Sequence, residues 1–400
     1  MLKKVILYLT FMWLGGYLSP LFHVNAVVDY LIPMALIVLL LFSRIQKEVP
    51  RLNVTYIILF AVGIVGSMFM AMIYHYQPLL GTAISQRPIY FLLCFFIWWK
   101  IGLTEDDLFP MLRILTIITL VTFTLSLFEP QWFLSNEAIE KHLSRKDTST
   151  DVLCFMPGHL YAILYLFYLL QSIPERFSKM DWAIVLATLA MFYVYQNRST
   201  LIYLGIILLY FVIKNRSKIG RGGRMTVVLS AIVVLLFGFP YIRTIAKSLI
   251  GETQEQLADD EYARKVAFQY YVFDYNKGSI PRILFGNGQP TNGSEYIVEM
   301  QEGHEMGAHW TDIGFVGDWF LYGMLPIVAI LIMAYKVFRY SFPQYLKYLF
   351  ASFIIVPTIH SFSGTNYYAF YFSIVMYLVC YNENRLSLLS DVHDEMPKNV

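Results

Sequence analysis

The sequence predicts an all-α, polytopic membrane protein with about twelve transmembrane helices and a large, partly helical periplasmic or extracellular loop. Of its 400 residues, 57% are hydrophobic and 14% are charged, whereas soluble domains carry about 25% charged residues. The apolar residues are gathered in repeated runs of membrane-spanning length. Most of these runs are apolar on all sides rather than along one stripe, which argues against a soluble helical protein.

Each apolar run is expected to form one membrane-spanning helix, because about 20 apolar residues in α-helical form cross the hydrocarbon layer. Residues 1–241 are expected to hold nine of these helices, and residues 311–381 hold three more. A large outer loop at 242–310 separates the two groups, and residues 382–400 form a cytoplasmic tail. The twelve expected spans are 5–22, 26–42, 52–74, 86–101, 108–128, 152–171, 181–196, 200–213, 225–241, 311–335, 346–362 and 367–381.

The distribution of lysine and arginine between the connections predicts the orientation of the spans. One set of connections, which includes both termini, holds 18 basic residues, and the short connections of the other set hold five. Because basic residues are enriched in cytoplasmic loops, both termini are expected in the cytoplasm. The apolar N-terminal segment lacks a small-x-small cleavage site, which favours an uncleaved first helix.

Several classes of site are not expected. The three cysteines all fall in apolar runs, which argues against a disulfide framework and against a cysteine-based zinc site. The sequence contains no Walker motif and no D-x-D triplet, so a nucleotide site and a metal–diphosphate site of that kind are not expected. No cofactor and no nucleic-acid partner is expected.

An arginine stands in a very short connection between two expected spans, in the stretch FYVYQNRSTLIYL at 192–204. Arg198 therefore lies at the outer end of a tight helical hairpin. Basic residues are not favoured on that side, and an arginine at the centre of a bilayer costs roughly 2.5–3.5 kcal/mol. Two interpretations remain open: the side chain extends to the outer headgroups, or it forms an anion site that faces a cavity.

The large outer loop is expected to contain a helix at 253–278, in TQEQLADDEYARKVAFQYYVFDYNKG. Acidic residues stand early in it, and a lysine–glycine pair fits its C-terminal end. The helix is expected to lie on the membrane surface, with Arg264 projecting from it. The next segment, PRILFGNGQP, contains glycines that indicate a tight turn. The apolar stripe of the helix consists of Tyr262, Val266, Tyr270 and Phe273.

Histidines are concentrated in the outer half of the expected topology. Histidine suits sugar hydroxyls and proton transfer near neutral pH, although a single histidine is more often a structural hydrogen-bonding residue. The grouping therefore indicates sugar binding or acid–base chemistry on this side. The seven histidines of the outer half are His23, His75, His142, His159, His304, His309 and His360.

His309 and Asp312 are the candidate catalytic pair. They stand three residues apart at the mouth of the tenth expected span, and they share a face if a helix begins there. A histidine oriented by a carboxylate is a suitable general base. Two alternatives remain open: His309 caps the helix and Asp312 is its N-terminal acid, or both residues bind a metal with His304. The spacing in HEMGAH differs from the H-E-x-x-H pattern of zinc proteases.

The order of these motifs resembles that of the Wzy-type O-antigen polymerases and the related O-antigen ligases, over roughly residues 85–330. QNRSTLI resembles the arginine hairpin of that family, and RKVAF followed by ILFGNG resembles its loop arginine, helix and glycine turn. HWTDIGFVGDWFLYG resembles the histidine-led segment that ends the large loop, and FMPGHLYAILYL resembles a span with proline and glycine. Ile202 and Trp310 depart from the family pattern, which has leucine and, in many relatives, asparagine there.

The resemblance implies an integral-membrane glycosyltransferase, GT-C-like, that acts on undecaprenyl diphosphate-linked glycans. It implies that Arg198, Arg264 and Arg87 bind the lipid diphosphate, since arginine offers fixed charge and forked donors to a leaving anion. It also implies that His309, held by Asp312, is the general base. The implied sugar- or acceptor-binding residues are His159, His304 and His360.

The function predicted from this resemblance is a polymerase that joins lipid-linked oligosaccharide repeats into O-antigen, capsule or exopolysaccharide. Transfer would invert the anomeric centre without a metal, on the outer face of the bacterial cytoplasmic membrane. The expected partners are the lipid-linked donor and acceptor, membrane lipids and a chain-length regulator. Two alternatives remain open: a ligase that transfers finished polymer to a lipid A core, and a flippase for lipid-linked oligosaccharides. The 69-residue outer loop argues against the flippase.

Overall fold

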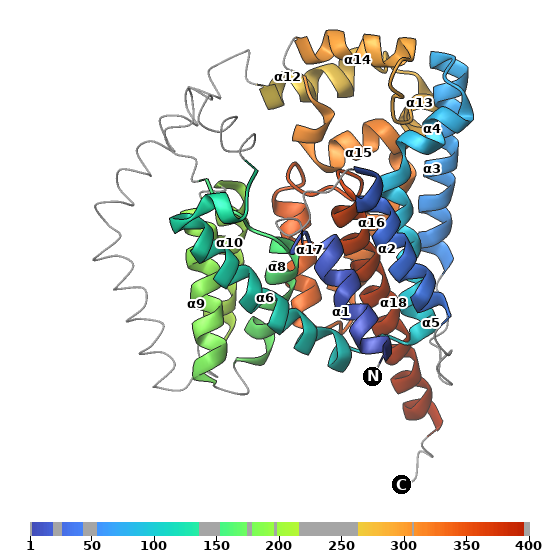
Figure 1. The fold of residues 1–400 in the computed structure, drawn as a ribbon. Helices are drawn as coiled ribbons and strands as arrows, with labels where there is room; N and C mark the ends of the chain where they lie inside the picture. Colours follow the sequence, from blue (N-terminus) through green and yellow to red (C-terminus); the bar gives the residue numbers. More distant parts are fainter. Residues whose placement is uncertain are drawn as a thin grey trace.

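Figure 1 shows the chain as a bundle of helices. Within the described residues every regular element is helical and no strand is formed, so the all-α prediction is confirmed for that part of the chain. The predicted ninth span, 225–241, lies outside it. The computed structural model describes residues 2–18, 26–42, 54–135, 153–173, 178–195, 198–215, 263–305 and 308–395.

The described helices follow the order of the expected apolar runs, with shorter helices between 263 and 322. The first group consists of α1 (Leu2–Leu14), α2 (Ala26–Leu41), α3 (Val54–His75), α4 (Leu79–Ser85), η1 (Arg87–Leu93), α5 (Cys94–Ile101), α6 (Glu105–Phe128), η2 (Pro130–Trp132), α8 (His159–Ser172), α9 (Lys179–Val194) and α10 (Arg198–Asn215). The second group consists of α12 (Ala263–Gln269), η3 (Tyr270–Asp274), α13 (Ile280–Phe285), α14 (Glu295–Glu305), η4 (Trp310–Ile313), α15 (Phe315–Tyr322), α16 (Met324–Arg339), α17 (Gln344–Ile355) and α18 (Asn366–Glu395).

Successive long helices run in alternating directions, which gives the bundle two ends (Figure 1). At one end, Lys3 near the start of α1 donates to the Ile101 carbonyl at the close of α5 over 2.6 Å. At this end Tyr56, near the start of α3, also donates to Glu383 of α18 over 2.6 Å, and Lys336 of α16 lies 2.7 Å from that carboxylate. This end is termed the terminal end. The opposite end, which carries α12, α13 and α14, is termed the loop end.

The start of α6 shows how the sequence sets a helix boundary. Thr104 has an extended backbone, and its hydroxyl accepts a hydrogen bond from the Asp107 amide over 3.2 Å. Acidic residues fill the first turn, where the helix dipole favours negative charge. Lys4 of α1 lies 3.1 Å from Asp107, and Tyr345 of α17 donates to Glu105 over 2.7 Å. The capped start therefore ties α6 to α1 and α17.

Aromatic side chains of α1, α5 and α18 form the centre of the bundle. Phe11, Trp98 and Phe370 are fully buried, with ring centroids between 5.1 and 5.7 Å apart. The indole nitrogen of Trp98 donates to the Ser373 hydroxyl over 2.9 Å, so its polar edge has a partner inside the core. This cluster fixes the first helix against the last one.

Small residues on α3 let two neighbouring elements approach its backbone. A Cβ atom at Gly63 would lie 2.6 Å from Cδ of Pro326 in α16, and a Cβ atom at Gly66 would lie 2.5 Å from the Phe285 ring in α13. Glycine at both positions therefore allows the close helix packing that is common in membrane proteins. α3 supports both α16 and the loop segment around α13 in this way.

The apolar run expected as a single span at 311–335 is broken in the structure. It forms η4, α15 and α16, because the chain turns at Gly314 and again at Gly323. The C-terminal end of α15 contacts the glycine turn after α13, where the Gly288 amide donates to the Leu321 carbonyl over 2.9 Å. The expectation of one continuous helix was therefore wrong, and the break places the end of α15 against the loop end.

The run expected as a span at 346–362 is also interrupted. α17 ends at Ile355, and Val356 leaves the helical region because the residue before a proline disfavours that conformation. The remaining residues fold back over α15, where the Phe315 amide donates to the Pro357 carbonyl over 3.1 Å. A loop therefore occupies the end of this expected span.

Helix length and composition support part of the expected membrane topology. α3 and α6 are long and apolar enough to cross a membrane, and α4 with η1–α5 adds a third candidate if this pair, bent by 71°, is one span. Other described helices are shorter or less apolar. The 14 residues of α8, for example, extend about 21 Å, less than the hydrocarbon core of about 30 Å. The described residues thus give two to three candidate spans, and the number of about twelve stays a prediction.

Candidate functional site

The loop end is built from short helices that begin at the first described residues of the large loop (Figure 1). The helix expected at 253–278 is present from Ala263 onward as α12 and the π-helical segment η3, and its earlier part lies outside the described residues. Because a π-helical turn contains an extra residue, the apolar stripe is displaced. Ala267 and Tyr271 are fully buried, whereas Phe273 is 64% exposed. An exposed Phe273 is compatible with a helix that lies on a membrane surface, so the expected stripe stays a prediction.

The tight turn predicted in PRILFGNGQP is present after α13. Gly286 has φ +77° and Gly288 has φ +72°, a region that favours glycine. A Cβ atom at Gly286 would lie 2.3 Å from the Leu321 carbonyl oxygen, and one at Gly288 would lie 2.8 Å from Cβ of Ala71 in α3. The turn fits between α3 and α15 because both residues are glycine.

Asn287 lies between these glycines and connects the segments of the loop end. It is fully buried, and its Nδ2 donates to Oδ1 of Asn276 and to the Phe320 carbonyl, each over 3.0 Å. Its Oδ1 accepts a hydrogen bond from Nε of Arg282 over 2.7 Å. Because both polar groups of this buried amide have partners, Asn287 holds Arg282 in one orientation.

Arg282 of α13 presents a positive charge at the loop end. Its guanidinium carbon lies 4.7 Å from the ring centroid of Tyr275 and 5.5 Å from that of Tyr74 in α3, within the range of cation–π contacts. The side chain is half-buried, and no carboxylate within the described part of the chain forms an ion pair with it. An oriented cation that forms no direct ion pair keeps its donors suited to an anionic ligand, although the Glu299 carboxylate lies on the other side of Tyr275.

Tyr275 connects this arginine to a histidine–carboxylate pair. His75, at the end of α3, is buried and stacks on Tyr296 with ring centroids 3.9 Å apart. Its Nδ1 lies 3.2 Å from Oε2 of Glu299, without the alignment of a hydrogen bond. Tyr275 donates to the same carboxylate over 3.0 Å. Burial, together with nearby Tyr296 and the charge of Glu299, raises the pKa of Tyr275 and keeps the phenol protonated.

The predicted catalytic pair stands at the entry to α15. His309 is half-buried directly before η4, and Asp312 within η4 is exposed. η4 packs against α12, the helix that contains Arg264. Tyr271 of η3, which directly follows α12, donates to the Ala308 carbonyl over 2.9 Å. The structure therefore brings the segments of the predicted base and the predicted loop arginine together, while the roles of these residues stay predictions.

Three predicted site residues are placed by their backbone alone. Arg198 begins α10, Arg264 is the second residue of α12, and His304 lies in the last turn of α14. Their side chains are outside the part of the chain that the structure describes. The diphosphate-binding and sugar-binding roles predicted for them therefore also stay predictions.

Aromatic rings surround the other two predicted sugar-binding histidines. His159 begins α8, and its ring lies 5.6 Å from that of Tyr367 and 6.3 Å from that of Tyr368, both in α18. His360 is buried, and its ring lies 5.6 Å from that of Tyr203 in α10. His159 thus packs against α18, and His360 packs against α10, the helix that Arg198 begins.

A buried carboxylate that the sequence interpretation did not select lies in α15. Asp318 is 2% exposed and accepts hydrogen bonds from the Ser361 hydroxyl and the Phe362 amide, each over 2.8 Å, and from the Ser363 hydroxyl. Because a buried carboxylate needs such partners, Asp318 fixes the loop after α17 to α15. The same loop contains His360.

Arg87 lies at the start of η1, directly after α4. It is exposed, and its guanidinium carbon lies 4.4 Å from the ring centroid of Tyr30 in α2. The loop after the glycine turn binds α4, where the hydroxyls of Ser85 and Thr291 lie 2.9 Å apart. Arg87 therefore also belongs to the loop end.

Arg282, His75 and Glu299 are the residues of this group that the sequence interpretation did not select. Arg282 stands four residues before the predicted glycine turn, which was a usable signal, but the pattern does not reveal which rings lie beside it. His75 was one histidine among seven. Glu299 gave no signal, because its partners are distant in the sequence.

Comparison with known proteins found no relative of this chain. No protein-family model matches it, and neither the curated proteins nor the solved structures contain a match. Within the described residues the fold defines an all-helical protein with membrane-spanning candidates and a loop end that holds Arg282 in a fixed orientation. The resemblance to the Wzy-type polymerases stays a prediction, and the function is inferred below from the arrangement of the loop end.

Replacing Gly286 by alanine is expected to lower the free energy of unfolding by roughly 2–6 kcal/mol, the sum of backbone strain and steric overlap. The overlap is with backbone atoms of α15, which cannot move aside as a flexible side chain would. Thermal unfolding of the purified protein in detergent measures the effect. Gly278→Ala is the control: its φ is +73°, but no atom lies within 4 Å of the added Cβ. Equal shifts for both variants would contradict the steric argument.

Proposed function

We propose that this chain is a membrane glycosyltransferase that polymerises lipid-linked oligosaccharide repeats into a surface polysaccharide. Its donor and acceptor are glycans carried on undecaprenyl diphosphate. The observation that carries the proposal is Arg282, a half-buried cation that Asn287 and the rings of Tyr275 and Tyr74 hold at the loop end. A lipid diphosphate leaving group needs stabilisation of its growing negative charge, and an oriented guanidinium supplies it.

The proposal places the loop end on the outer face of a bacterial cytoplasmic membrane, with about twelve spans and both termini in the cytoplasm. Large apolar side chains on the outer surfaces of α2, α3 and α10 support lipid contact, because soluble proteins do not expose apolar surface so extensively. Lysines at the terminal end, including Lys3, Lys100 and Lys336, agree with a cytoplasmic side.

In the proposed reaction an acceptor hydroxyl attacks the anomeric carbon of the donor sugar. A new carbon–oxygen bond forms as the bond to the diphosphate oxygen breaks, and the lipid diphosphate leaves with the electron pair. His309 takes the hydroxyl proton, with Asp312 holding the ring. Arg282 joins Arg198, Arg264 and Arg87 in binding the lipid diphosphate and stabilising its negative charge as it leaves. Attack opposite the leaving group inverts the anomeric centre, and the reaction consumes no nucleotide.

The test is chain growth by the purified protein in lipid nanodiscs supplied only with undecaprenyl diphosphate-linked repeats. The expected product is a ladder of longer lipid-linked glycans, and a chelator is expected to leave the ladder unchanged. Empty nanodiscs are the control.

Absence of a ladder from folded protein would overturn the proposal. Transfer of preformed polymer to a lipid A core, with no extension of the repeats, would instead identify a ligase. Movement of lipid-linked repeats across the bilayer without new glycosidic bonds would identify a flippase.

A further inference from the structure

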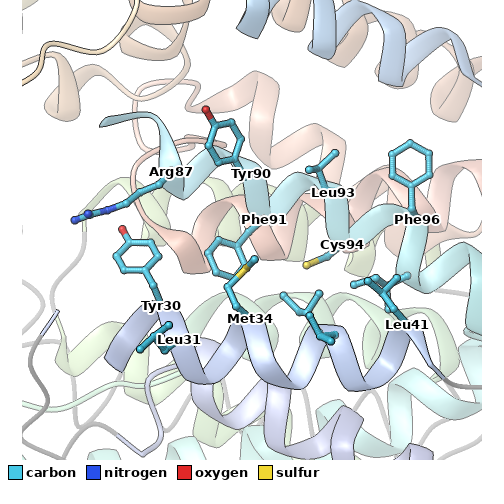
Figure 2. A pocket seen from close by; sticks show the side chains of 13 residues that line it. Tyr30, Leu31, Met34, Leu41, Arg87, Tyr90, Phe91, Leu93, Cys94 and Phe96 are labelled. Atoms are coloured by element: carbon cyan, nitrogen blue, oxygen red, sulfur yellow. The ribbon is translucent and has the colours of Figure 1, made fainter. Parts of the chain in front are cut away.

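A long apolar groove runs between α2 and the η1–α5 segment. It has a volume of about 700 Å³, within the range of small-molecule binding pockets. Figure 2 shows α2 along one wall and η1–α5 along the other. Leu31 and Met34 contribute from the first wall, and Leu93 and Phe96 contribute from the second. All four side chains are exposed, so the groove is open toward the surroundings of the bundle.

One end of this groove is cationic. Figure 2 places Arg87 and Tyr30 together at that end, and Leu41 and Phe96 toward the other. The Arg87 guanidinium stacks over the Tyr30 ring, which orients it without using its N–H donors. Within the described residues no carboxylate forms an ion pair with Arg87. Its forked donors therefore remain suited to a phosphate oxygen pair.

The opposite end of the groove lies near the terminal end of the bundle. There Lys100, one residue before the end of α5, donates to the Leu41 carbonyl at the end of α2. The groove thus extends from a single arginine at the loop end to Leu41 near the terminal end, along most of the length of α2. This shape and charge complement an amphiphile with one anionic head and a linear hydrocarbon chain.

We propose that this groove binds the part of a polyprenyl chain nearest the head group of a lipid diphosphate, with the diphosphate at Arg87. The choice of a polyprenyl lipid rests on the proposed function. Arg87 lies at the loop end, because the loop that follows Arg282 and Asn287 contacts α4 through Thr291 and Ser85. A lipid in the groove would therefore present its diphosphate-linked glycan on the side of the candidate site.

Native mass spectrometry of the purified protein in detergent tests the inference directly. The probe is C55 polyprenyl diphosphate, compared with the neutral C55 polyprenol, inorganic diphosphate and phosphatidylglycerol. The polyprenyl diphosphate is expected to bind about tenfold more tightly than the polyprenol, through charge-assisted hydrogen bonds to Arg87. Inorganic diphosphate and phosphatidylglycerol are expected to displace it poorly.

Two variants separate binding of the head from binding of the chain. Arg87→Gln is expected to weaken polyprenyl diphosphate about tenfold and to leave polyprenol binding unchanged. Leu93→Trp fills the groove and is expected to weaken both lipids. Leu209→Trp is the matched control, because Leu209 on α10 is 62% exposed, close to the 59% of Leu93, and lies outside the groove.

Three results would overturn the inference. They are equal effects of the Leu93 and Leu209 variants, displacement by phosphatidylglycerol at equal concentration, and displacement by inorganic diphosphate at equal concentration. The first two would identify surface lipid only, and the third a free anion site. Because binding is measured without an acceptor, its outcome is separable from chain growth. If a glycan ladder forms but both groove variants bind the lipids as wild type does, the proposed function is retained and the groove is not the lipid site. If the lipids bind as expected but no ladder forms, the groove is retained as the lipid site and the proposed function is wrong.

Discussion

Replacing Arg282 by glutamine is expected to slow glycan chain growth about a hundredfold or more, the loss found when a donor to a developing oxyanion is removed. Glutamine retains a donor within reach of Asn287 but carries no charge. The substitution therefore removes the cation that faces the leaving group, while the buried amide that organises the loop end is preserved. Ladder formation in nanodiscs measures the rate, and thermal unfolding shows that the fold is retained.

Two further variants make this result specific to charge and geometry. Arg282→Lys keeps a positive charge but loses the fork and the hydrogen bond from Nε to Asn287, so we expect a rate between those of wild type and Arg282→Gln. Arg113→Gln is the matched control: Arg113 is 43% exposed in α6 and pairs with Asp181 of α9, away from the loop end. Normal chain growth by Arg282→Gln would remove Arg282 from the leaving-group site and leave Arg198, Arg264 and Arg87 as the predicted ligands.

Arg282 also shows which parts of the site a sequence can predict. The glycine turn after it was predictable, because two glycines in FGNG indicate backbone that other residues rarely adopt. The aromatic rings beside Arg282 were not predictable, because Tyr74 comes from α3 and lies about two hundred positions earlier in the chain. Such a contact depends on how α13 packs on Gly66, which no local pattern encodes.

The helical class was predictable for a related reason. Apolar runs separated by polar connections specify helices locally, so α2, α3 and α9 begin and end within a few residues of the expected spans. The breaks at Gly314 and Gly323 were missed, because hydropathy remains high across both positions. The turn at Gly323 is stabilised by contact with the loop end: a Cβ atom there would lie 2.2 Å from the Leu284 carbonyl oxygen. Tertiary packing therefore decided where the expected tenth span ends and begins again.

Replacing His309 by alanine is expected to reduce polymer formation at least a hundredfold without lowering thermal stability, because a general base contributes about 10²–10⁴-fold to rate. His309 is half-buried and precedes a short helical turn, so its removal leaves little empty volume in the core. Binding of the lipid-linked donor is expected to be unchanged. Ladder formation, donor binding and thermal unfolding are measured on the same preparation.

The variant His75→Ala tests whether a different histidine of the loop end is the general base. His75 also belongs to the loop end and lies 3.2 Å from the carboxylate of Glu299, so by geometry alone it rivals His309 as the base. Its side chain is only 3% exposed, however, and its ring lies beside those of Tyr296 and Tyr275, so it offers little surface to an acceptor sugar. We therefore expect His75→Ala to lower the unfolding temperature and to reduce polymer only in proportion to the loss of folded protein. The reverse pattern, with a stable but inactive His75→Ala and an active His309→Ala, would transfer the role of general base to His75 and Glu299.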